Sequence, residues 1–420
     1  MSNAADRVLE RIDDEELASL AVELGAIEAP AGAEGPAADA VEAWMTDQGF
    51  KPRRIGLVED RASIVGRLRG FGSGPTLVLN AHLDTAISRN DTLVYIDPTQ
   101  PRYISAWREG NTLFGNGLIN DKAPMAAFLI AAAAIKRSGV EMGGDVLLHA
   151  VPGEIGLEPV DEFQGPSHLG KDLGARYAIA HGVVGDAALV AEATGNAIGW
   201  VEPGKAFFKV TVLGGEPMYT PFVPVEPDTT ENPNAIVRLV PVITALNEWA
   251  AVYASRRFDC PGGSVVPKAN IGAVRGGHPD KITKSSQLAH LYLDIRTRPD
   301  TGPMEIHREL IEVLDKTGVP YEIECFLHRR GYEATGIEEL ATAVGEAHKA
   351  EFGSEPSQPP APVTSMWRDI TPFNEAGIPS LTYGPSSSTG GGNYSLSVED
   401  LAVTARVYAR SMLLFCGTTG

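Results

Sequence analysis

The chain has 420 residues, of which 43% are hydrophobic and 21% charged, and its formal net charge is −19 at pH 7. This length is more than one ordinary core encloses, so we expect two domains. The acidic balance disfavours nucleic acids and anionic membranes as partners. It remains compatible with a small anionic substrate if arginines line the pocket.

Two further features bear on the compartment. No apolar run is expected to span a bilayer, and residues 1–14 are polar and acidic, unlike a secretory signal. Cys260, Cys325 and Cys416 lie far apart without a CxxC pair. This spacing argues against a disulfide framework and a thiolate zinc site, and it fits a reducing compartment. We therefore expect a cytoplasmic protein.

The first half of the chain alternates apolar runs with segments of helical spacing, which predicts an α/β layered domain. Predicted helices are 16–24, 37–47 and 123–138, and predicted strands are 63–68, 76–80 and 145–151.

The pattern of apolar and polar residues changes near residue 203, and an alternating strand is predicted at 206–213. The Pro-rich segment 216–233 follows, and its length suggests a lid or contact loop. Beyond it we predict a helix at 234–250, two further strands with one helix up to about 328, and a final helix at 397–414. The economical organisation is a small α+β domain inserted into a larger α/β domain, with boundaries at 1–202, 203–328 and 329–420.

The strongest local motif is His82 with Asp84, directly after the apolar run 76–80. Side chains two apart on a strand point to one face, so the pair suits a metal-bound imidazole tuned by a neighbouring carboxylate. Alone, this short motif arises often by chance.

Three later segments strengthen it. A glycine-rich loop, 115–122, carries Asn120 and Asp121 just before a predicted helix, and Glu154 and Glu192 each follow an apolar strand. Each taken singly is more often a turn or a solvated carboxylate. Together they matter, because ligands of α/β sheets gather at the carboxyl ends of the strands.

In order and spacing these residues resemble the zinc aminoacylase and carboxypeptidase family, which includes acetylornithine deacetylase, succinyl-diaminopimelate desuccinylase and glutamate carboxypeptidase. The resemblance extends to segments 234–236, 293–296, 375–379 and 383–385. It implies a three-layer metallopeptidase-like catalytic domain with an inserted ferredoxin-like dimerisation and lid domain, hence a homodimer. Members are similar in using two bridged metal ions to hydrolyse an amide bond of a small carboxylate-bearing substrate.

The family pattern is incomplete here. The first metal position maps to His82, Glu192 and a bridging residue that is Asn120, or Asp121 if the alignment shifts by one. An asparagine offers one neutral oxygen, whereas a carboxylate offers two anionic ones. The bridge of the family is therefore weakened.

The second metal position keeps only Glu154. The family's general base maps to Gly153, its C-terminal histidine falls within 389–392, and its lid histidine maps to Met218. About one ligand is too few for a stable second cation. We therefore predict one divalent metal per chain, manganese or zinc, with Asp84 and Glu154 as catalytic residues.

These departures favour a hydrolase that cleaves a C–N bond by a metal-activated water. An electron-poor aromatic amine would need the least help from the protein, so the chain resembles a 5-nitroanthranilate aminohydrolase of this family. Arg368 is the candidate for the substrate carboxylate, with a structural ion pair as the equal alternative. Tyr219, beside Met218, is predicted to contact the substrate.

Three other aspects stay open. Trp367 is a further stacking candidate, and His149 and His328 are replacement acids or bases, each more often simply structural. A second hypothesis is conventional hydrolysis of N-acyl amino acids or dipeptides, with Glu154 or Asp121 as base. A third is a non-catalytic binding protein on the same scaffold.

Overall fold

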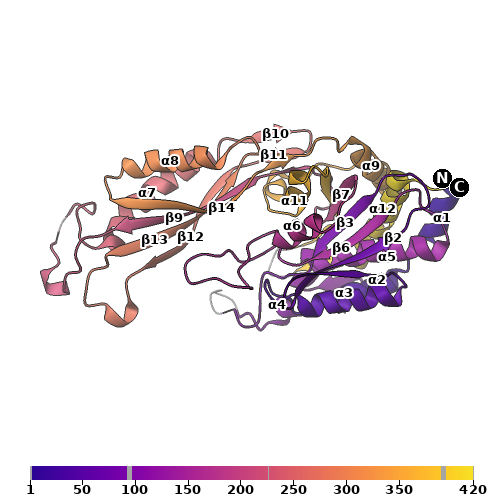
Figure 1. The fold of residues 1–420 in the computed structure, drawn as a ribbon, viewed down its shortest axis with the longest axis horizontal. Coiled ribbons are helices and arrows are strands. Elements are labelled where there is room, and N and C mark those ends of the chain that lie inside the picture. The colour runs from indigo at the N-terminus through magenta and orange to yellow at the C-terminus, as the bar shows by residue number, and fades with distance from the viewer. Residues whose placement is uncertain (1, 92–96, 226, 389–393, 420) are drawn as a thin grey trace. The chain divides into compact units, whose positions relative to one another are not determined.

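The computed structural model describes residues 2–91, 97–225, 227–388 and 394–419. The chain forms two compact units, and Figure 1 shows the elements of each. Unit 1 comprises Met1–Trp200, Ala334–Pro359 and Arg368–Gly420, and unit 2 comprises Val201–Glu333 and Pro360–Trp367. The smaller unit is thus inserted into the larger one, and a short second segment, 360–367, also belongs to it.

A six-stranded sheet is the centre of unit 1, with the order β1-β2-β6-β3-β7-β16. Its strands are β1 (Arg53–Val58), β2 (Arg61–Leu68), β3 (Leu77–His82), β6 (Val146–Val151), β7 (Ala187–Ala191) and β16 (Ser380–Tyr383). Strands β6, β3, β7 and β16 run parallel, whereas β1 and β2 pair antiparallel at one edge. The carboxyl ends of β6, β3 and β7 therefore meet at one edge of the sheet.

Helices cover both faces of this sheet and make three layers (Figure 1). One face packs against α2 (Asp14–Gly25), α3 (Gly35–Asp47), α5 (Ala123–Ser138), α9 (Glu338–Phe352) and α12 (Val398–Cys416). The other packs against α6 (Leu173–Ala180) and α11 (Ile370–Glu375). Since β3 is buried on both faces, its sequence is a continuous apolar run rather than an alternating one.

Short elements complete unit 1. They are α1 (Ser2–Leu9), α4 (Pro101–Ile104), the π-helical turn Leu118–Lys122, and a three-stranded sheet of β4 (Trp107–Glu109), β5 (Thr112–Phe114) and β17 (Ser395–Ser397).

Unit 2 contains a four-stranded antiparallel sheet with the order β12-β13-β9-β14. Its elements follow the chain as β9 (Gly204–Leu213), α7 (Ala235–Tyr253), β12 (Lys268–Gly276), β13 (Leu288–Thr297), α8 (Pro303–Asp315) and β14 (Tyr321–Arg329). This is the βαββαβ order of a ferredoxin-like domain, and both helices pack on the sheet around one apolar core. The expected α/β fold with an inserted α+β domain is confirmed.

Smaller elements of unit 2 were only partly predicted. They are β8 (Val201–Glu202), β10 (Phe258–Cys260), β11 (Gly263–Val265), β15 (Tyr332–Glu333), α10 (Ala361–Thr364) and the turns Thr220–Phe222 and Pro279–Lys281. The expectation of two strands with one helix between 250 and 328 was wrong, because three long strands, β12, β13 and β14, accompany α8, and the short hairpin of β10 and β11 precedes them.

The expectation that no segment is long and apolar enough to cross a membrane was also wrong. Two helices meet that criterion: Leu118–Ser138, whose apolar window is 94% buried, and Ala235–Tyr253, whose window is 28% buried. The first packs inside unit 1 as the alanine-rich helix over the sheet. The second packs one face on the sheet of unit 2, while Ile236, Val240 and Val252 remain exposed.

Candidate metal centre

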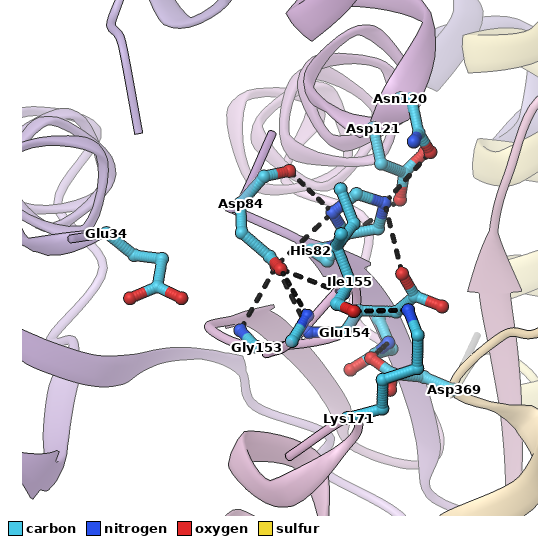
Figure 2. A network of polar contacts seen from close by, with 12 residues as sticks. Glu34, His82, Asp84, Asn120, Asp121, Gly153, Glu154, Ile155, Lys171 and Asp369 are labelled. Atoms are coloured by element: carbon cyan, nitrogen blue, oxygen red, sulfur yellow. Dashed lines mark hydrogen bonds and ion pairs between the residues drawn. The ribbon is translucent and has the colours of Figure 1, made fainter. Parts of the chain in front are cut away.

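Three loops at the carboxyl edge of the unit 1 sheet bring the acidic site together. His82 is the last residue of β3, Glu192 directly follows β7, and Glu154 lies three residues after β6. All three side chains are buried, with 1%, 6% and 6% of their surface exposed. The parallel register of β3 with β6 and β7 places these strand ends next to one another, as Figure 2 shows for His82 and Glu154.

The two nitrogens of His82 have distinct surroundings. Its Nδ1 lies 2.9 Å from the backbone oxygen of Asp84, which fixes the proton on Nδ1. Its Nε2 lies 3.0 Å from Oδ1 of Asn120, to which a protonated Nε2 donates, and 4.0 Å from Oε2 of Glu154. A cation at this point would replace the Nε2 proton, while the hydrogen bond of Nδ1 keeps the ring in the orientation of a metal-ligating imidazole.

Three side chains at this point could hold a metal ion. His82, Asp121 and Glu192 offer one ligand atom each, and these atoms lie within 4.8 Å of one another. Asp121 is fully buried, its Oδ2 accepts the His82 amide at 3.3 Å, and its Oδ1 has no hydrogen-bond partner in the described part of the chain. An orphaned buried carboxylate oxygen beside an imidazole and a second carboxylate fits a divalent cation.

Asp84 is held by four backbone N–H groups, which we call the Asp84 cradle. Its Oδ1 accepts from Gly153 and Glu154, both at 3.1 Å, and its Oδ2 accepts from Ile155 at 2.8 Å and Gly156 at 3.3 Å. The turn needs left-handed φ values of 78° at Gly153 and 52° at Gly156, which glycine adopts without strain. Successive N–H groups of this kind form an anion-binding nest.

The electrostatics separate the carboxylates. Burial raises the pKa of Asp84, but the hydrogen bond and charge of His82 and the charge of Lys171 more than compensate and lower it to about 2. Burial raises the pKa of Glu192 to about 7, although Arg368 and His82 oppose this shift. Burial and the charge of Glu192 raise the pKa of Asp121 well above its ordinary value. Without a cation, Asp121 and Glu192 therefore favour bound protons, whereas Asp84 stays ionised.

Burial by itself lowers the pKa of His82, but its hydrogen bond to Asp84 and the charges of Glu154, Asp84 and Asp121 raise it well above its ordinary value. The site therefore attracts positive charge, and a divalent cation would supply it in place of protons.

Arg368 lies beside this group. Its side chain is 5% exposed, and its Nε is 3.8 Å from Oε2 of Glu192. The alternative for Arg368 was a structural ion pair with Asp369 or a neighbour; Asp369 accepts from Nδ2 of Asn80 at 3.0 Å, and the carboxylate that pairs with Arg368 is that of Glu192. Burial and the charge of Glu154 raise the pKa of Asp369 well above its ordinary value.

Several other candidates belong to unit 2. Met218 and Tyr219 belong to unit 2, where the Met218 amide donates to Ser285 Oγ at 2.9 Å and Tyr219 is 53% exposed. His328 lies on β14. Trp367 is buried in unit 2, and Nζ of Lys205 lies 4.5 Å from the centroid of its ring. The glycine tract 389–392 lies outside the described residues.

His149 is fully buried on β6, and burial, with the charge of Arg53, lowers its pKa to about 3. This behaviour is that of a neutral core histidine rather than of an acid or base at neutral pH.

Three residues near the site carried no recognised motif. Lys171 donates through Nζ to the backbone oxygen of Ile155, and Glu34 and Arg61 form a buried ion pair near Gly153. The signal in the sequence was weak, because Glu34 and Arg61 have the sequence setting of ordinary surface charges: a Gly/Pro-rich turn and a strand start.

Comparison with known proteins decides the family. The model of peptidase family M20/M25/M40 matches residues 78–414, which is most of the chain. The chain belongs to the M20 family. M20 proteins bind divalent metals and act on C–N bonds, so the chain is a hydrolase of that class, and the non-catalytic hypothesis is set aside.

Solved M20-fold structures resemble the chain over almost its whole length. They include the dipeptidase Dug1p from Saccharomyces cerevisiae, with a TM-score of 0.72, 14% identity, and 99% of each chain covered. An M20 metallo-carboxypeptidase from Sulfolobus solfataricus has a TM-score of 0.70 at 16% identity and covers 96% of this chain and 99% of its own. At these identities the likeness concerns the fold alone.

A curated relative matches a shorter segment. The N-formyl-4-amino-5-aminomethyl-2-methylpyrimidine deformylase of Bacillus subtilis strain 168 is 29% identical over 148 residues, which is 33% of this chain and 33% of that protein. The match therefore spans about a third of each sequence.

Proposed function

We propose that the chain is a metal-dependent amidohydrolase that releases an amine from a small carboxylate-bearing N-acyl substrate. The observation that carries this proposal is the group of His82, Asp121 and Glu192, with ligand atoms within 4.8 Å, beside Glu154, whose Oε2 lies 4.0 Å from His82 Nε2. Deformylase and peptidase names among the relatives support acyl transfer to water.

His82, Asp121 and Glu192 would hold one divalent ion, manganese or zinc, with Asn120 supplying a further oxygen. When bound, such an ion supplies Lewis acidity and lowers the pKa of water. Of the two residues that aligned with the bridging position, Asp121 would be the stronger ligand, because a bound cation would keep its carboxylate anionic and its Oδ1 has no hydrogen-bond partner among the described residues.

Glu154 takes the general-base role in this proposal. Its carboxylate lies outside the group of His82, Asp121 and Glu192, and its Oε2 is 4.0 Å from Nε2 of His82. Only 6% of its surface is exposed, so a proton taken from water is shielded from bulk solvent until the leaving amine accepts it.

Arg368 binds the substrate carboxylate. Its guanidinium is buried next to the Glu192 carboxylate, which partly balances the positive charge of Arg368 before a substrate carboxylate binds. Met218 and Tyr219 remain predicted substrate contacts from the inserted domain.

A second candidate is deamination of an electron-poor aromatic amine such as 5-nitroanthranilate. Its support is the neutral Asn120 amide oxygen 3.0 Å from His82 Nε2, where the family resemblance expects a bridging carboxylate, because this favours a single ion and a substrate that stores negative charge itself.

One experiment separates these candidates. Protein purified without chelators is analysed for metal and assayed with N-formyl and N-acetyl amino acids, dipeptides and 5-nitroanthranilate. We expect about one manganese or zinc per chain and release of amino acid from the N-acyl substrates, abolished by chelation and restored by the metal. Ammonia release from nitroanthranilate alone would transfer the function to the second candidate, and two metals per chain would refute the single-ion site.

We also propose a cytoplasmic homodimer formed through unit 2. Support comes from Ile236, Val240 and Val252 on α7, which are 43%, 56% and 62% exposed, and from β12, which is an edge strand of the sheet. The three cysteines are free, as a reducing compartment would keep them. Sedimentation of the wild type and of Val240→Glu tests the dimer, which the charge should dissociate.

A further inference from the structure

Unit 1 contains a buried ion pair that the proposed chemistry does not use. Arg61 donates through Nε to Oε2 of Glu34 and through Nη2 to Oε1, both at 2.8 Å. The two side chains are 2% and 0% exposed. A bidentate pair removed from water this completely keeps a fixed geometry, because each charge depends on the other for its partner.

The pair joins three separate segments of the chain. Glu34 Oε1 also accepts the Gly32 amide at 3.0 Å, and Arg61 Nη1 donates to the backbone oxygen of Pro166 at 2.9 Å. Pro166 lies in the long loop between β6 and α6, which begins with the turn 153–156. Arg61 thus anchors the loop that contains the Asp84 cradle.

Arg61 also touches the cradle itself. A Cβ added at Gly153 would lie 2.8 Å from Nη2 of Arg61, so the guanidinium packs directly against this backbone. Figure 2 shows Glu34 on the side of Asp84 away from Asn120 and Asp121. Burial and, next, the charge of Asp84 raise the pKa of Glu34, although Arg61 opposes the shift, so the ion pair and Asp84 lie within electrostatic reach of each other.

We propose that Arg61, held by Glu34, is a positioning residue for the metal centre: it fixes the turn 153–156, which holds Asp84 and thereby the orientation of His82. This inference rests on the proposed metal-dependent function. It also explains Gly153, because the space that a side chain at this position would occupy belongs to Arg61. A glutamate introduced there would pair with the guanidinium instead of acting as a base.

The test is a double-mutant cycle of Arg61→Met, Glu34→Gln and both together in the full-length protein. Two properties are measured for each variant: hydrogen exchange of the amides at 153–156, and the affinity for Mn²⁺ or Zn²⁺ by titration. Arg410→Met is the matched control. Arg410 on α12 pairs with Glu351 on α9, away from the site but in the same unit.

We expect Arg61→Met to speed exchange of these amides at least tenfold and to weaken metal affinity about 10–100-fold, the usual effect of losing support behind a ligand. Arg410→Met should change neither the exchange rate of these amides nor the metal affinity by more than about twofold, because Arg410 supports no residue of the site. If Arg61→Met does not fold, Arg61→Lys provides the test, since it keeps the charge but loses the planar fork, and it should show the same changes at smaller size.

Exchange and metal affinity within twofold of the wild type in the folded variant would overturn the positioning role. The outcome is separable from that of the proposed function. If no C–N substrate is cleaved by the wild type, yet Arg61→Met loosens the turn and weakens metal binding, the substrate proposal fails and the positioning role stands.

Discussion

Replacement of Asp84 by asparagine perturbs the site with almost no change of volume. The carboxylate accepts four backbone N–H groups, two on each oxygen, at 2.8–3.3 Å. An asparagine has one acceptor oxygen, so its NH₂ group must face two of these donors. Either orientation leaves two buried N–H groups without a partner.

The cost follows from this geometry. An unpaired buried donor costs about 1–3 kcal/mol, so the two together should lower the free energy of unfolding by about 2–6 kcal/mol. Loss of the negative charge also removes one of the groups that raise the pKa of His82, and loss of support behind a ligand weakens metal affinity about 10–100-fold. Stability and metal binding should therefore fall together.

The assay combines urea unfolding of the metal-free protein with metal titration of the folded protein. Asp145→Asn is the control, since Asp145 accepts the Gly70 amide at 2.7 Å just before the opposite end of β6. It should lower stability while leaving metal affinity within about twofold. If Asp84→Asn keeps wild-type metal affinity, or if Asp145→Asn weakens it equally, the proposed role of the Asp84 cradle is refuted.

Three further predictions concern single residues. Glu154→Gln should reduce kcat about 10²–10⁴-fold while one metal per chain is retained, because only the proton acceptor is lost; loss of the metal would instead make Glu154 a ligand. Arg368→Met should raise KM for carboxylate-bearing substrates about 10-fold or more with little change for their amides; equal effects on both would refute carboxylate binding. His149 has a pKa lowered from 6.5 to about 3, so the unfolded chain takes up a proton that the folded chain refuses, and stability is lost as pH falls from 6.5 towards 3. The loss is about 1.4 kcal/mol per pH unit below 6.5, hence about 2 kcal/mol at pH 5, and urea unfolding of His149→Leu should show a correspondingly flatter acid profile; an unchanged profile would contradict the neutral buried state.

The sequence was sufficient for the large elements and for the ligand residues. Continuous apolar runs identified β3 and β6 because parallel strands buried on both faces require them. Polar residues directly after those runs identified His82 and Glu154, since the carboxyl ends of parallel strands collect ligands. Short pairs such as β10 and β11 were missed because three residues are too few to show a period.

Sequence alone determined that this chain is an acidic α/β protein with an inserted α+β domain and that His82, Asp84, Glu154 and Glu192 lie at or just after strand ends, because burial and strand periodicity act on neighbouring residues. Only the tertiary structure decided that Asp121 places an unpaired oxygen beside His82 and that Arg61 occupies the space next to Gly153. These relations join residues dozens of positions apart. They depend on strand order and loop packing, which no local pattern records.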